Sequence, residues 1–293
     1  SKDNNFAIGK PVGLTLDLDE LPSPYLDGFL DPFLKGDYLP ILQTSRLCPY
    51  TCAFCVSGKN RGKLRAFNNE MVKEEMNYVF KHFVEKSHYR LYLADENFGV
   101  LKRDIEIAEH LLWCSENIGY PKSIFFYNDK RFTETSRKIQ EILAPLSTHG
   151  VALALQTDNP EALKAINRVN LTKTQIESAI DWAANKDFYI TTELIFGLPL
   201  ETRESFIKTL NDSVSVGFDS VVCHNLFIVD GIELNRPEER KKFGLKTKYR
   251  PLSTNYGMIN GKFSFETEEV VISNSSFNFQ EYLEIQIYIY HYQ

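Results

Sequence analysis

From residue 39 onward, short apolar runs alternate with longer segments in which apolar side chains recur every three or four positions. Short apolar runs are typical of buried strands, whereas the wider spacing is typical of helices with one buried face. The pattern therefore predicts alternating strands and helices along this part of the chain. The predicted strands cover residues 39–44, 89–94, 123–128, 151–156, 188–196 and 219–228.

Capping signals place helices between these strands. Asn69 is expected to cap the first helix, and Asn159 followed by Pro160 supplies an N-cap with a proline at the first helical position. Thr172 and Gln175 form a capping-box pair ahead of another apolar stripe. The remaining predicted helices cover residues 103–117, 133–146 and 202–216.

Six strand–helix units in about 190 residues indicate an α/β fold with a parallel sheet and helices outside it. Eight such units would close a full barrel of about 250 residues. Six units predict a partial (β/α)6 TIM-like barrel that is open on one side. In parallel folds of this kind the working residues gather at the carboxyl ends of the strands.

The segments that flank the predicted core, 39–235, have a different character. Residues 1–38 contain four of the twelve prolines and are expected to form an N-terminal leader or linker. Residues 236–250 carry seven basic and two acidic side chains, a run that is most often a solvated face, with contact to a charged cofactor or substrate as the alternative. The small C-terminal extension, 236–293, ends in an apolar tail that needs packing partners, so we expect the natural chain to continue beyond Gln293.

Composition narrows the functional class. The 293 residues carry a net charge of −6, which gives no overall basic surface for nucleic acid. No apolar run approaches the roughly 20 residues of a membrane span. The five cysteines are an odd number without a secretory leader, which argues against a disulfide framework. We therefore expect a protein of the reducing cytoplasm, with neither nucleic acid nor a membrane as its partner.

Three of the cysteines lie close together directly after the first predicted strand. Cys48, Cys52 and Cys55 have the spacing C-x3-C-x2-C. Three thiolates this close can hold three irons of a [4Fe–4S] cube and leave the fourth iron without a protein ligand. An open position on a metal allows it to take part in chemistry rather than only store electrons. An iron–sulfur cluster is therefore the favoured interpretation of this loop.

The alternatives for the loop are a zinc site and, after that, inert thiols. A structural zinc site needs a fourth Cys or His, usually from a second pair of ligands. The nearest downstream histidines, His82 and His88, lie in a predicted helix and at its exit, so neither is on a loop. The two remaining cysteines, Cys114 and Cys223, fall in apolar patterns and are predicted to be small buried hydrophobic residues.

The cysteine spacing, with Phe54 directly before the last cysteine, resembles that of the radical S-adenosylmethionine (radical SAM) enzymes. The resemblance implies a [4Fe–4S] cluster whose open iron is chelated by the amino and carboxylate groups of SAM. It also implies that an electron from the cluster cleaves SAM to a 5′-deoxyadenosyl radical. A one-electron donor such as a flavodoxin or a ferredoxin would supply that electron. A partial barrel is the shape known for the cores of this family.

The resemblance further implies SAM contacts at the ends of later strands. Asp95, Glu96 and Asn97 end the second strand, where family members place polar groups that bind the SAM amino group. A simple Asx turn is the alternative. Gln156 lies on the face of the fourth strand that carries two alanines, so it should point into the barrel near its mouth.

Two longer segments carry the resemblance into the second half of the core. Residues 155–168 resemble the Q-(S/T)-x-N-P … L-K-x-I-x-R stretch of cobalamin-binding radical SAM enzymes and related methylthiotransferases, which implies that Arg168 grips the SAM carboxylate. An exposed arginine at a helix end is the alternative. Residues 193–199 resemble the G-x-I-x-G-x-x-P segment that lies against adenine, where Gly197 would permit a close backbone approach. Glu193 stands where that motif has its first glycine. The alternative role for Glu193 is to bind the ribose hydroxyls of SAM.

Segments 18–28, 55–65 and 243–250 look like those that bracket the core in cobalamin-dependent radical SAM proteins. In those proteins a cobalamin-binding domain precedes the first segment, and we expect it to be missing from this chain. The implied function is a radical SAM core of the methylase type, in which methylcobalamin supplies the methyl group. A cobalamin-independent rearrangement, oxidation or group transfer is one alternative, and a zinc- or cluster-binding module without turnover is another.

Four more residues near predicted strand ends are candidates to face an unknown substrate, with core or turn roles as the alternative. They are Tyr127, Asn128, His224 and Asn225.

Overall fold

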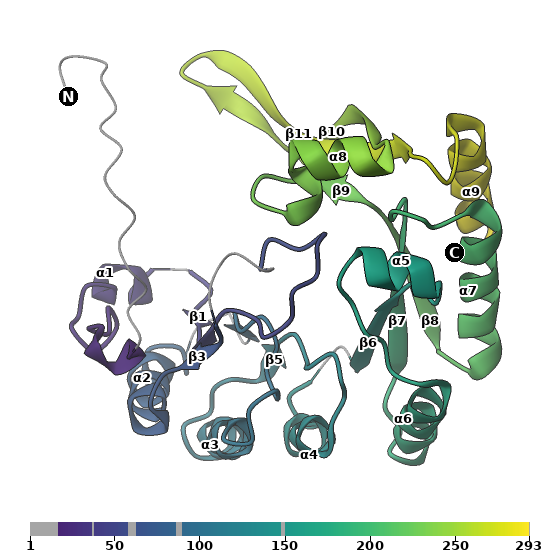
Figure 1. Ribbon diagram of the computed structural model, residues 1–293. Coiled ribbons are helices and arrows are strands. Elements are labelled where there is room, and N and C mark those ends of the chain that lie inside the picture. The colour runs from purple at the N-terminus through teal and green to yellow at the C-terminus, as the bar shows by residue number, and fades with distance from the viewer. Residues whose placement is uncertain (1–16, 37, 58–62, 86–89, 148–149, 293) are drawn as a thin grey trace.

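The computed structural model describes residues 17–36, 38–57, 63–85, 90–147 and 150–292. Within these ranges, six strands follow one another in the predicted order with helices between them, which confirms the predicted α/β class (Figure 1). They form two three-stranded parallel sheets, ordered β1-β4-β5 and β6-β7-β8. The strands are β1 Ile41–Leu42, β4 Arg90–Leu93, β5 Ser123–Phe125, β6 Val151–Gln156, β7 Ile190–Phe196 and β8 Ser220–Asn225.

The two sheets meet between β5 and β6. The side-chain amide of Asn128, just beyond β5, donates a hydrogen bond to the carbonyl of Ala152 in β6 over 2.9 Å. Gln140 in turn donates to the Asn128 side chain over 3.1 Å, and an isolated bridge joins Ile124 to Ser147. Side chains therefore connect the sheets where regular strand pairing stops, and the six strands act as one partial barrel.

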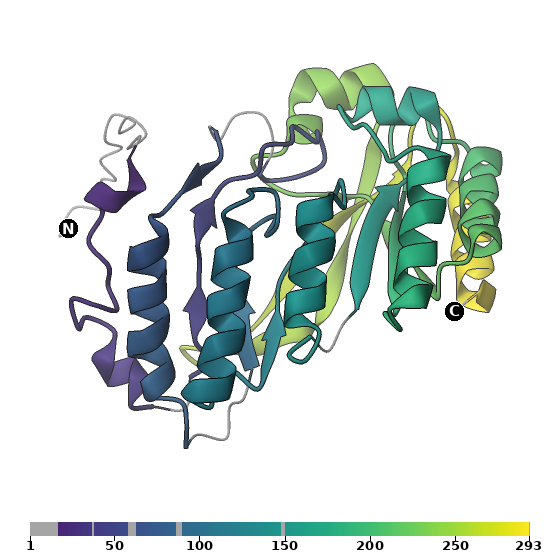
Figure 2. The same ribbon diagram turned by 90° about the horizontal axis from the view of Figure 1, so that it is seen from below.

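The helices cover the outer side of the strands in a row (Figure 2). Thr172 and Gln175 exchange the predicted capping-box hydrogen bonds. The predicted cap at Asn69 is wrong by one residue: the side chain of Asn68 accepts from the backbone N–H of Glu70 over 2.8 Å, so the helix begins at Asn69. The helices are α2 Asn69–Lys81, α3 Asp104–Asn117, α4 Glu134–Leu143, α5 Pro160–Ala165, α6 Lys173–Asn185 and α7 Arg203–Val216.

Beyond the barrel, the chain adds a long antiparallel hairpin, which projects from the body, and a final helix (Figure 1). Arg240 forms a two-pronged ion pair with Glu269 at 2.8 and 2.7 Å, so part of the basic run at 236–250 is neutralised within the chain. The elements are β9 Phe227–Ile228, η2 Glu233–Asn235, α8 Pro237–Phe243, β10 Lys246–Ile259, β11 Lys262–Ser273 and α9 Phe279–Tyr292.

Several strands are shorter than predicted. β1 stops at Leu42 because the backbone N–H of Thr44 donates to the carboxylate of Asp95 instead of to a strand. β5 keeps three of its six predicted residues. The end of the strand predicted at 219–228 separates as β9, which pairs antiparallel with β11. At these three places side-chain contacts or a distant segment of the chain decide where the strand ends.

The described part of the leader packs against α2. Tyr78 donates a hydrogen bond to Asp31 over 2.7 Å, and Ser23 donates to Glu75. The leader is therefore anchored to the barrel over these residues. The short elements in this region are η1 Leu18–Glu20 and α1 Asp31–Leu34, and the pair β2 Ser45–Arg46 and β3 Arg65–Ala66 lies further along the chain.

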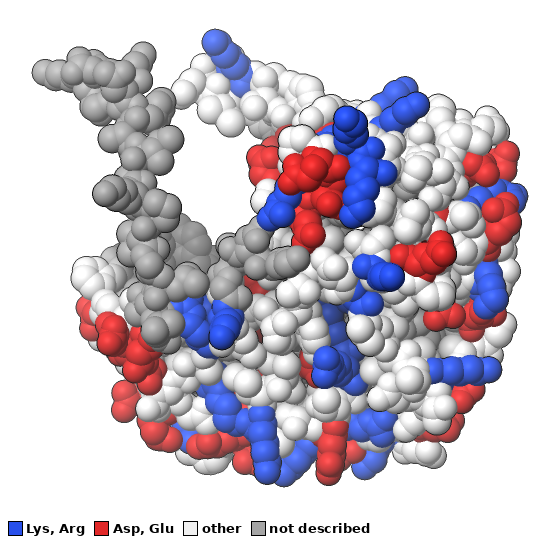
Figure 3. All heavy atoms as spheres, in the orientation of Figure 1, with Lys and Arg blue, Asp and Glu red and all other residues white. Residues whose placement is uncertain are grey.

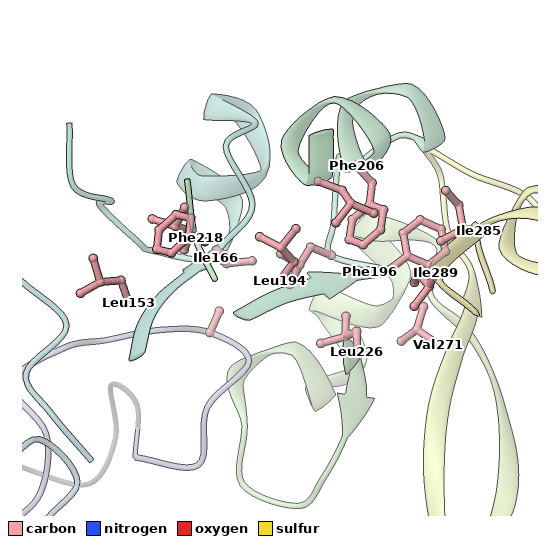
Figure 4. Close-up of a cluster of buried hydrophobic side chains, with 14 of the residues drawn as sticks. Leu153, Ile166, Leu194, Phe196, Phe206, Phe218, Leu226, Val271, Ile285 and Ile289 are labelled. Carbon is pink, nitrogen blue, oxygen red and sulfur yellow. The ribbon is translucent and has the colours of Figure 1, made fainter. Parts of the chain in front are cut away.

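A buried cluster joins the second sheet to the C-terminal elements (Figure 4). Leu194 and Phe196 of β7 and Phe206 of α7 lie in it with Val271 of β11 and Ile285 of α9, and all five are fully buried. Burying side chains of this size contributes roughly 1.5–3 kcal/mol each. The apolar tail therefore has packing partners within this chain. Of the helices in the described ranges, none is long and apolar enough to cross a membrane.

Candidate active site

The three predicted cluster cysteines lie on the loop that follows the short strand β2, just beyond the carboxyl end of β1. Two of them are buried, and the third, Cys55, is partly exposed. Ala53 anchors the loop through its backbone: its N–H donates to the carbonyl of Ile166 over 3.0 Å, and its carbonyl accepts from the N–H of Leu234 over 3.1 Å. Segments from two other parts of the chain therefore fix the position of the cysteines.

Polar side chains reach two of the thiols. The amide Nδ2 of Asn97 donates to Sγ of Cys48 over 2.9 Å, and Nη1 of Arg168 lies 3.8 Å from Sγ of Cys52. Burial raises the pKa of the Cys48 thiol above its ordinary value, and the nearby positive charge of Lys130 acts in the opposite direction. Donors and positive charge of this kind stabilise sulfur that carries negative charge.

The donor set suits a cluster. In a [4Fe–4S] cube the thiolates bind different irons, so they do not converge on one point. Two buried oxygens close to the loop, Oε2 of Glu96 and Oδ1 of Asn97, have no hydrogen-bond partner among the described residues. Three thiols and unused buried acceptors fit a cluster that binds a further ligand with N–H groups.

A cavity of about 500 Å³ lies on the inner face of the strands, beside the cysteine loop. Phe54, Glu96, Gln156 and Glu193 all line it, so the structure brings together four residues that sequence reasoning had chosen one by one. Gln156 has φ +70°, a left-handed conformation that is costly for a residue other than glycine. Backbone strain at a cavity mouth is a feature of functional sites.

The four substrate candidates also line this cavity. In addition, Nε2 of His224 in β8 lies 4.0 Å from the carboxylate of Glu193 in the neighbouring strand β7. The two alanines of β6, Ala152 and Ala154, lie in the wall as the alternation predicted. Sequence reasoning missed Phe125 and Phe227, whose rings add apolar surface to the wall.

Lys130 is the main functional candidate that sequence reasoning missed. It lines the cavity and also lies near the Cys48 thiol. It stands two residues after Asn128, at the carboxyl end of the third barrel strand, where the fold concentrates working residues. That position was the only signal available, because a lone lysine in a loop has no motif of its own.

Asp95 faces a different environment from its neighbour Glu96. Its carboxylate accepts hydrogen bonds from the N–H and the hydroxyl of Thr44, both over 2.9 Å, and from the hydroxyl of Ser45 over 2.5 Å. Asp95 is buried and is absent from the lining of the cavity. Its contacts tie the end of β1 to the end of β4, a support for the cysteine loop rather than a ligand contact.

Arg168 is not the exposed helix-end arginine of the alternative interpretation. Besides approaching Cys52, its guanidinium donates to the carbonyl of Ala154 and to Oδ1 of Asn170, the latter over 3.1 Å. The side chain therefore links β6 to the cysteine loop and carries a fixed positive charge beside the thiols.

Gly197 has φ +102°, which favours glycine. A Cβ atom here would lie 3.3 Å from Cβ of Leu226 and 3.7 Å from Cβ of Val271. The close backbone approach at Gly197 is therefore to β11 and to the residue after β8, and this glycine does not line the cavity.

Fold and site together define an α/β enzyme core with a cluster-type cysteine loop at the carboxyl end of its first strand. Residues 42–213 match the sequence profile described as the Radical SAM superfamily, and the chain belongs to this superfamily. The protein is therefore a radical SAM enzyme, and the cofactors of this family are a [4Fe–4S] cluster and SAM.

Comparisons with individual proteins refine the relationship. The chain is 30% identical over 239 residues to the cobalamin-dependent radical SAM methyltransferase TokK of Streptomyces tokunonensis. It is 31% identical over 237 residues to the 2-(S-pantetheinyl)-carbapenam-3-carboxylate methyltransferase of Streptantibioticus cattleyicolor. Each match covers 78% of this chain and 34% of the relative, so the chain spans about a third of the length of these proteins.

The fold is similar to that of the radical SAM methyltransferase TsrM from Kitasatospora setae, solved with tryptophan substrate and a SAM analogue. The TM-score is 0.57 at 14% identity, and the match covers 76% of this chain and 43% of the other. At this identity the likeness concerns the fold.

Proposed function

We propose that this chain is the catalytic core of a cobalamin-dependent radical SAM methyltransferase. A substrate carbon would lose a hydrogen atom to the radical made from SAM and receive a methyl group, with cobalamin as the methyl carrier. The observation that carries the proposal is the convergence of Phe54, Glu96, Gln156 and Glu193, from four separate segments, on one cavity beside the cysteine loop. The methyl outcome and cobalamin rest on the named relatives, and cobalamin is assigned no contact within this chain.

The side chains divide the work of holding SAM. When bound, the [4Fe–4S] cluster supplies the electron that cleaves SAM to a 5′-deoxyadenosyl radical. Glu96 would accept hydrogen bonds from the SAM amino group, since its Oε2 is buried and without a partner in the described chain. Arg168 would supply positive charge beside the Cys52 thiol, on the side of the loop away from the cavity. Glu193 and Gln156 are placed to orient the ribose and the rest of the nucleoside.

The cavity walls would also protect the reaction. Phe54, Phe125, Tyr127 and Phe227 give the cavity aromatic surface, which keeps water away and limits side reactions of a reactive intermediate.

We assign catalysis to residues 39–235, with 1–38 as a leader and 236–293 as an extension. The family match at 42–213 supports this division, since it lies wholly within the proposed core. Val271 and Ile285 pack into the core cluster, so we treat the extension as a structural part of the barrel and not as an independent domain.

The test of SAM cleavage is anaerobic reconstitution of the chain with iron and sulfide, reduction, and measurement of 5′-deoxyadenosine. Cys52→Ala should lose iron and product. Cys114→Ala is the matched control, because this buried thiol lies in α3 away from the loop, and it should retain both. Iron binding without 5′-deoxyadenosine under strong reductant would contradict the proposal.

The cobalamin part has its own test, which is the sequence of the gene upstream of residue 1. A cobalamin-binding domain encoded there supports methylation. A gene that encodes neither such a domain nor a neighbouring cobalamin protein favours the cobalamin-independent alternative.

A further inference from the structure

Arg103 is a largely buried cation for which the proposed function has no role. Positive and negative side chains are interspersed over the face seen in Figure 3, but the side chain of Arg103 is only 21% exposed. It stands directly before α3, and its side chain makes no capping hydrogen bond to that helix. Burial lowers the pKa of Arg103, and the carboxylates of Asp104 and Asp95 oppose this shift. A charge is costly to bury without hydrogen-bond partners, and those of Arg103 lie at the base of the cysteine loop.

Arg103 binds both strands from which this loop emerges. The loop leaves β2 and returns through β3, and these strands pair over only two residues each. Beyond the last pair, the backbone N–H of Phe67 donates to the carbonyl of Thr44 over 3.0 Å. Nη2 of Arg103 donates to the same carbonyl over 2.6 Å, and Nη1 donates to the carbonyl of Phe67 over 3.1 Å. The guanidinium therefore joins the two strands where their own pairing stops.

Two further contacts fix the plane of the guanidinium. Nη1 also donates to Oδ1 of Asn69 over 2.6 Å, and Nε lies 3.3 Å from the carboxylate of Asp104. An isolated two-stranded ladder is at best marginally stable in water, so the stem formed by β2 and β3 depends on this clamp. A lysine would carry the same charge but lacks the planar fork that reaches two carbonyls at once.

Backbone strain lies between this stem and the first cysteine. Leu47 has φ +73°, a left-handed conformation that is costly for a leucine. The next residue is Cys48, whose sulfur accepts the hydrogen bond from Asn97. A strained residue of this kind persists only where the surrounding contacts over-determine its conformation. The Asn97–Cys48 contact fixes one side of Leu47, and the stem closed by Arg103 fixes the other.

We propose that Arg103 is a positioning residue for SAM cleavage, which closes the stem of the cysteine loop and keeps Leu47 in the turn that directs the Cys48 thiol toward Asn97. The proposal rests on the proposed function, because the position of this thiol affects a reaction only if a cluster bound there cleaves SAM. When the clamp is lost, the stem opens, the strain at Leu47 is released, and Cys48 leaves its buried position. A displacement of about 1 Å at a reacting centre can lower a rate about 100-fold.

The first test uses the cluster-free chain and does not depend on activity. Arg103→Lys keeps the charge and removes the fork, and mass spectrometry follows the alkylation of each cysteine by iodoacetamide. Cys48 is 7% exposed, and local opening of the stem should make its alkylation about tenfold faster in the variant. Cys114, buried in the helix that follows Arg103, should stay within about twofold of its rate in the parent, which shows that the fold is intact.

Arg203→Lys is the matched control. Arg203 begins α7 and pairs with Glu284 of α9 at 3.0 Å, so the substitution makes the same chemical change at the start of another barrel helix. Alkylation of Cys48 in this control should stay within about twofold of the parent. Adding Leu47→Gly to Arg103→Lys removes the strain, because glycine adopts a positive φ readily, and should slow the alkylation of Cys48 again by about threefold.

The second test measures 5′-deoxyadenosine formed by the reconstituted proteins with dithionite and saturating SAM. At equal iron content, Arg103→Lys should form product about tenfold more slowly. The Kd for SAM should rise by less than about threefold, because the SAM contacts assigned to Glu96 and Gln156 are unchanged. A loss mainly in the rate, with SAM binding retained, distinguishes positioning from a general loss of structure.

Four outcomes would each overturn the positioning role. They are unchanged Cys48 alkylation or unchanged product formation in Arg103→Lys, equal changes in Arg203→Lys, no recovery with Leu47→Gly, and a loss of product that only follows a loss of iron. Absence of 5′-deoxyadenosine from the parent would instead overturn the proposed function. The alkylation rates would still decide whether Arg103 closes the loop, so the two failures are distinguishable.

Discussion

The side-chain amide of Asn97 donates a hydrogen bond to the sulfur of Cys48 over 2.9 Å. Sequence reasoning grouped Asn97 with Asp95 and Glu96 as contacts of the SAM amino group. The structure gives these three neighbours three different surroundings: a support under β1, an acceptor in the cavity, and a donor to a thiol. Each surrounding leads to a different expected result on substitution.

Replacing Asn97 with leucine should lower the reduction potential of the cluster. A hydrogen bond to a ligating sulfur stabilises the more negative, reduced cluster, so its loss favours the oxidised form. One such bond is worth about 1 kcal/mol net, which for a one-electron couple is roughly 40 mV. Redox titration of the reconstituted protein without SAM, followed by electron paramagnetic resonance, measures the shift.

The Asn97→Asp variant provides the matched comparison. It keeps the shape but replaces the donor with a carboxylate, so its potential should fall below that of Asn97→Leu. Iron content must match the parent in both. Potentials equal to the parent in both variants would show that the Asn97–Cys48 contact does not influence the cluster.

Asp95→Ala and Glu96→Gln should affect different properties: the first should lower the stability of the fold, and the second should weaken the binding of SAM. Loss of the Asp95 carboxylate leaves donors on Thr44 and Ser45 unpaired, which we expect to lower the free energy of unfolding by about 3 kcal/mol. Glu96→Gln should change that free energy by less than about 0.5 kcal/mol and raise the Kd for SAM about tenfold or more, because a charged acceptor is lost. Urea denaturation and SAM titration of the reconstituted protein measure the two effects. Similar stability losses in both variants would contradict the division of roles.

The sequence predicted the six strands, the cysteine loop and eight of the residues that line the cavity, because each has a local signal. Strand alternation determines the face on which Gln156 and Glu193 lie, and the loop after a strand must open at its carboxyl end. The division between Asp95 and Glu96 depends on whether a side chain meets β1 or the cavity. That depends on the register of β1 against β4, which neither strand encodes alone.

Gly197→Ala should destabilise the fold rather than act mainly on SAM. Its φ of +102° is strained for alanine, and the new Cβ would crowd Leu226 at 3.3 Å, so we expect a loss of about 1–3 kcal/mol in the free energy of unfolding. Gly257→Ala in β10 is the matched control, because no atom lies within 4 Å of its Cβ position and its φ is not positive. Urea denaturation of both cluster-free variants gives the comparison. Equal free energies of unfolding in Gly197→Ala and Gly257→Ala would contradict the packing role of Gly197.

Sequence reasoning assigned Gly197 to adenine because the contact between Gly197 and the hairpin has no local signal. The Gly-Leu-Pro segment resembles a family motif, but the segment that packs against Gly197 is 74 residues further along, at Val271. No local pattern relates these two positions.

Asp104 should make the stability of the fold depend on pH. Its carboxylate accepts from the backbone N–H groups of Gly99 and Leu101 over 2.9 and 3.1 Å. Burial nevertheless raises its pKa to about 6, although the adjacent Arg103 opposes the shift. The ordinary pKa is 3.8, so the folded chain binds the extra proton between about pH 4 and pH 6. The stability this proton contributes, about 2–3 kcal/mol, is fully present below pH 4 and is lost as pH rises through 6.

Asp104→Asn removes this titration, so the free energy of unfolding of the parent should increase relative to the variant as pH falls from 7 to 5. Urea denaturation of the cluster-free proteins at pH 5, 6 and 7 measures the difference. Asp181→Asn removes a carboxylate at an exposed position in α6. The difference in the free energy of unfolding between this control variant and the parent should be the same at the three pH values. Parallel curves for Asp104→Asn and the parent would mean that burial does not hold the pKa of Asp104 above its ordinary value.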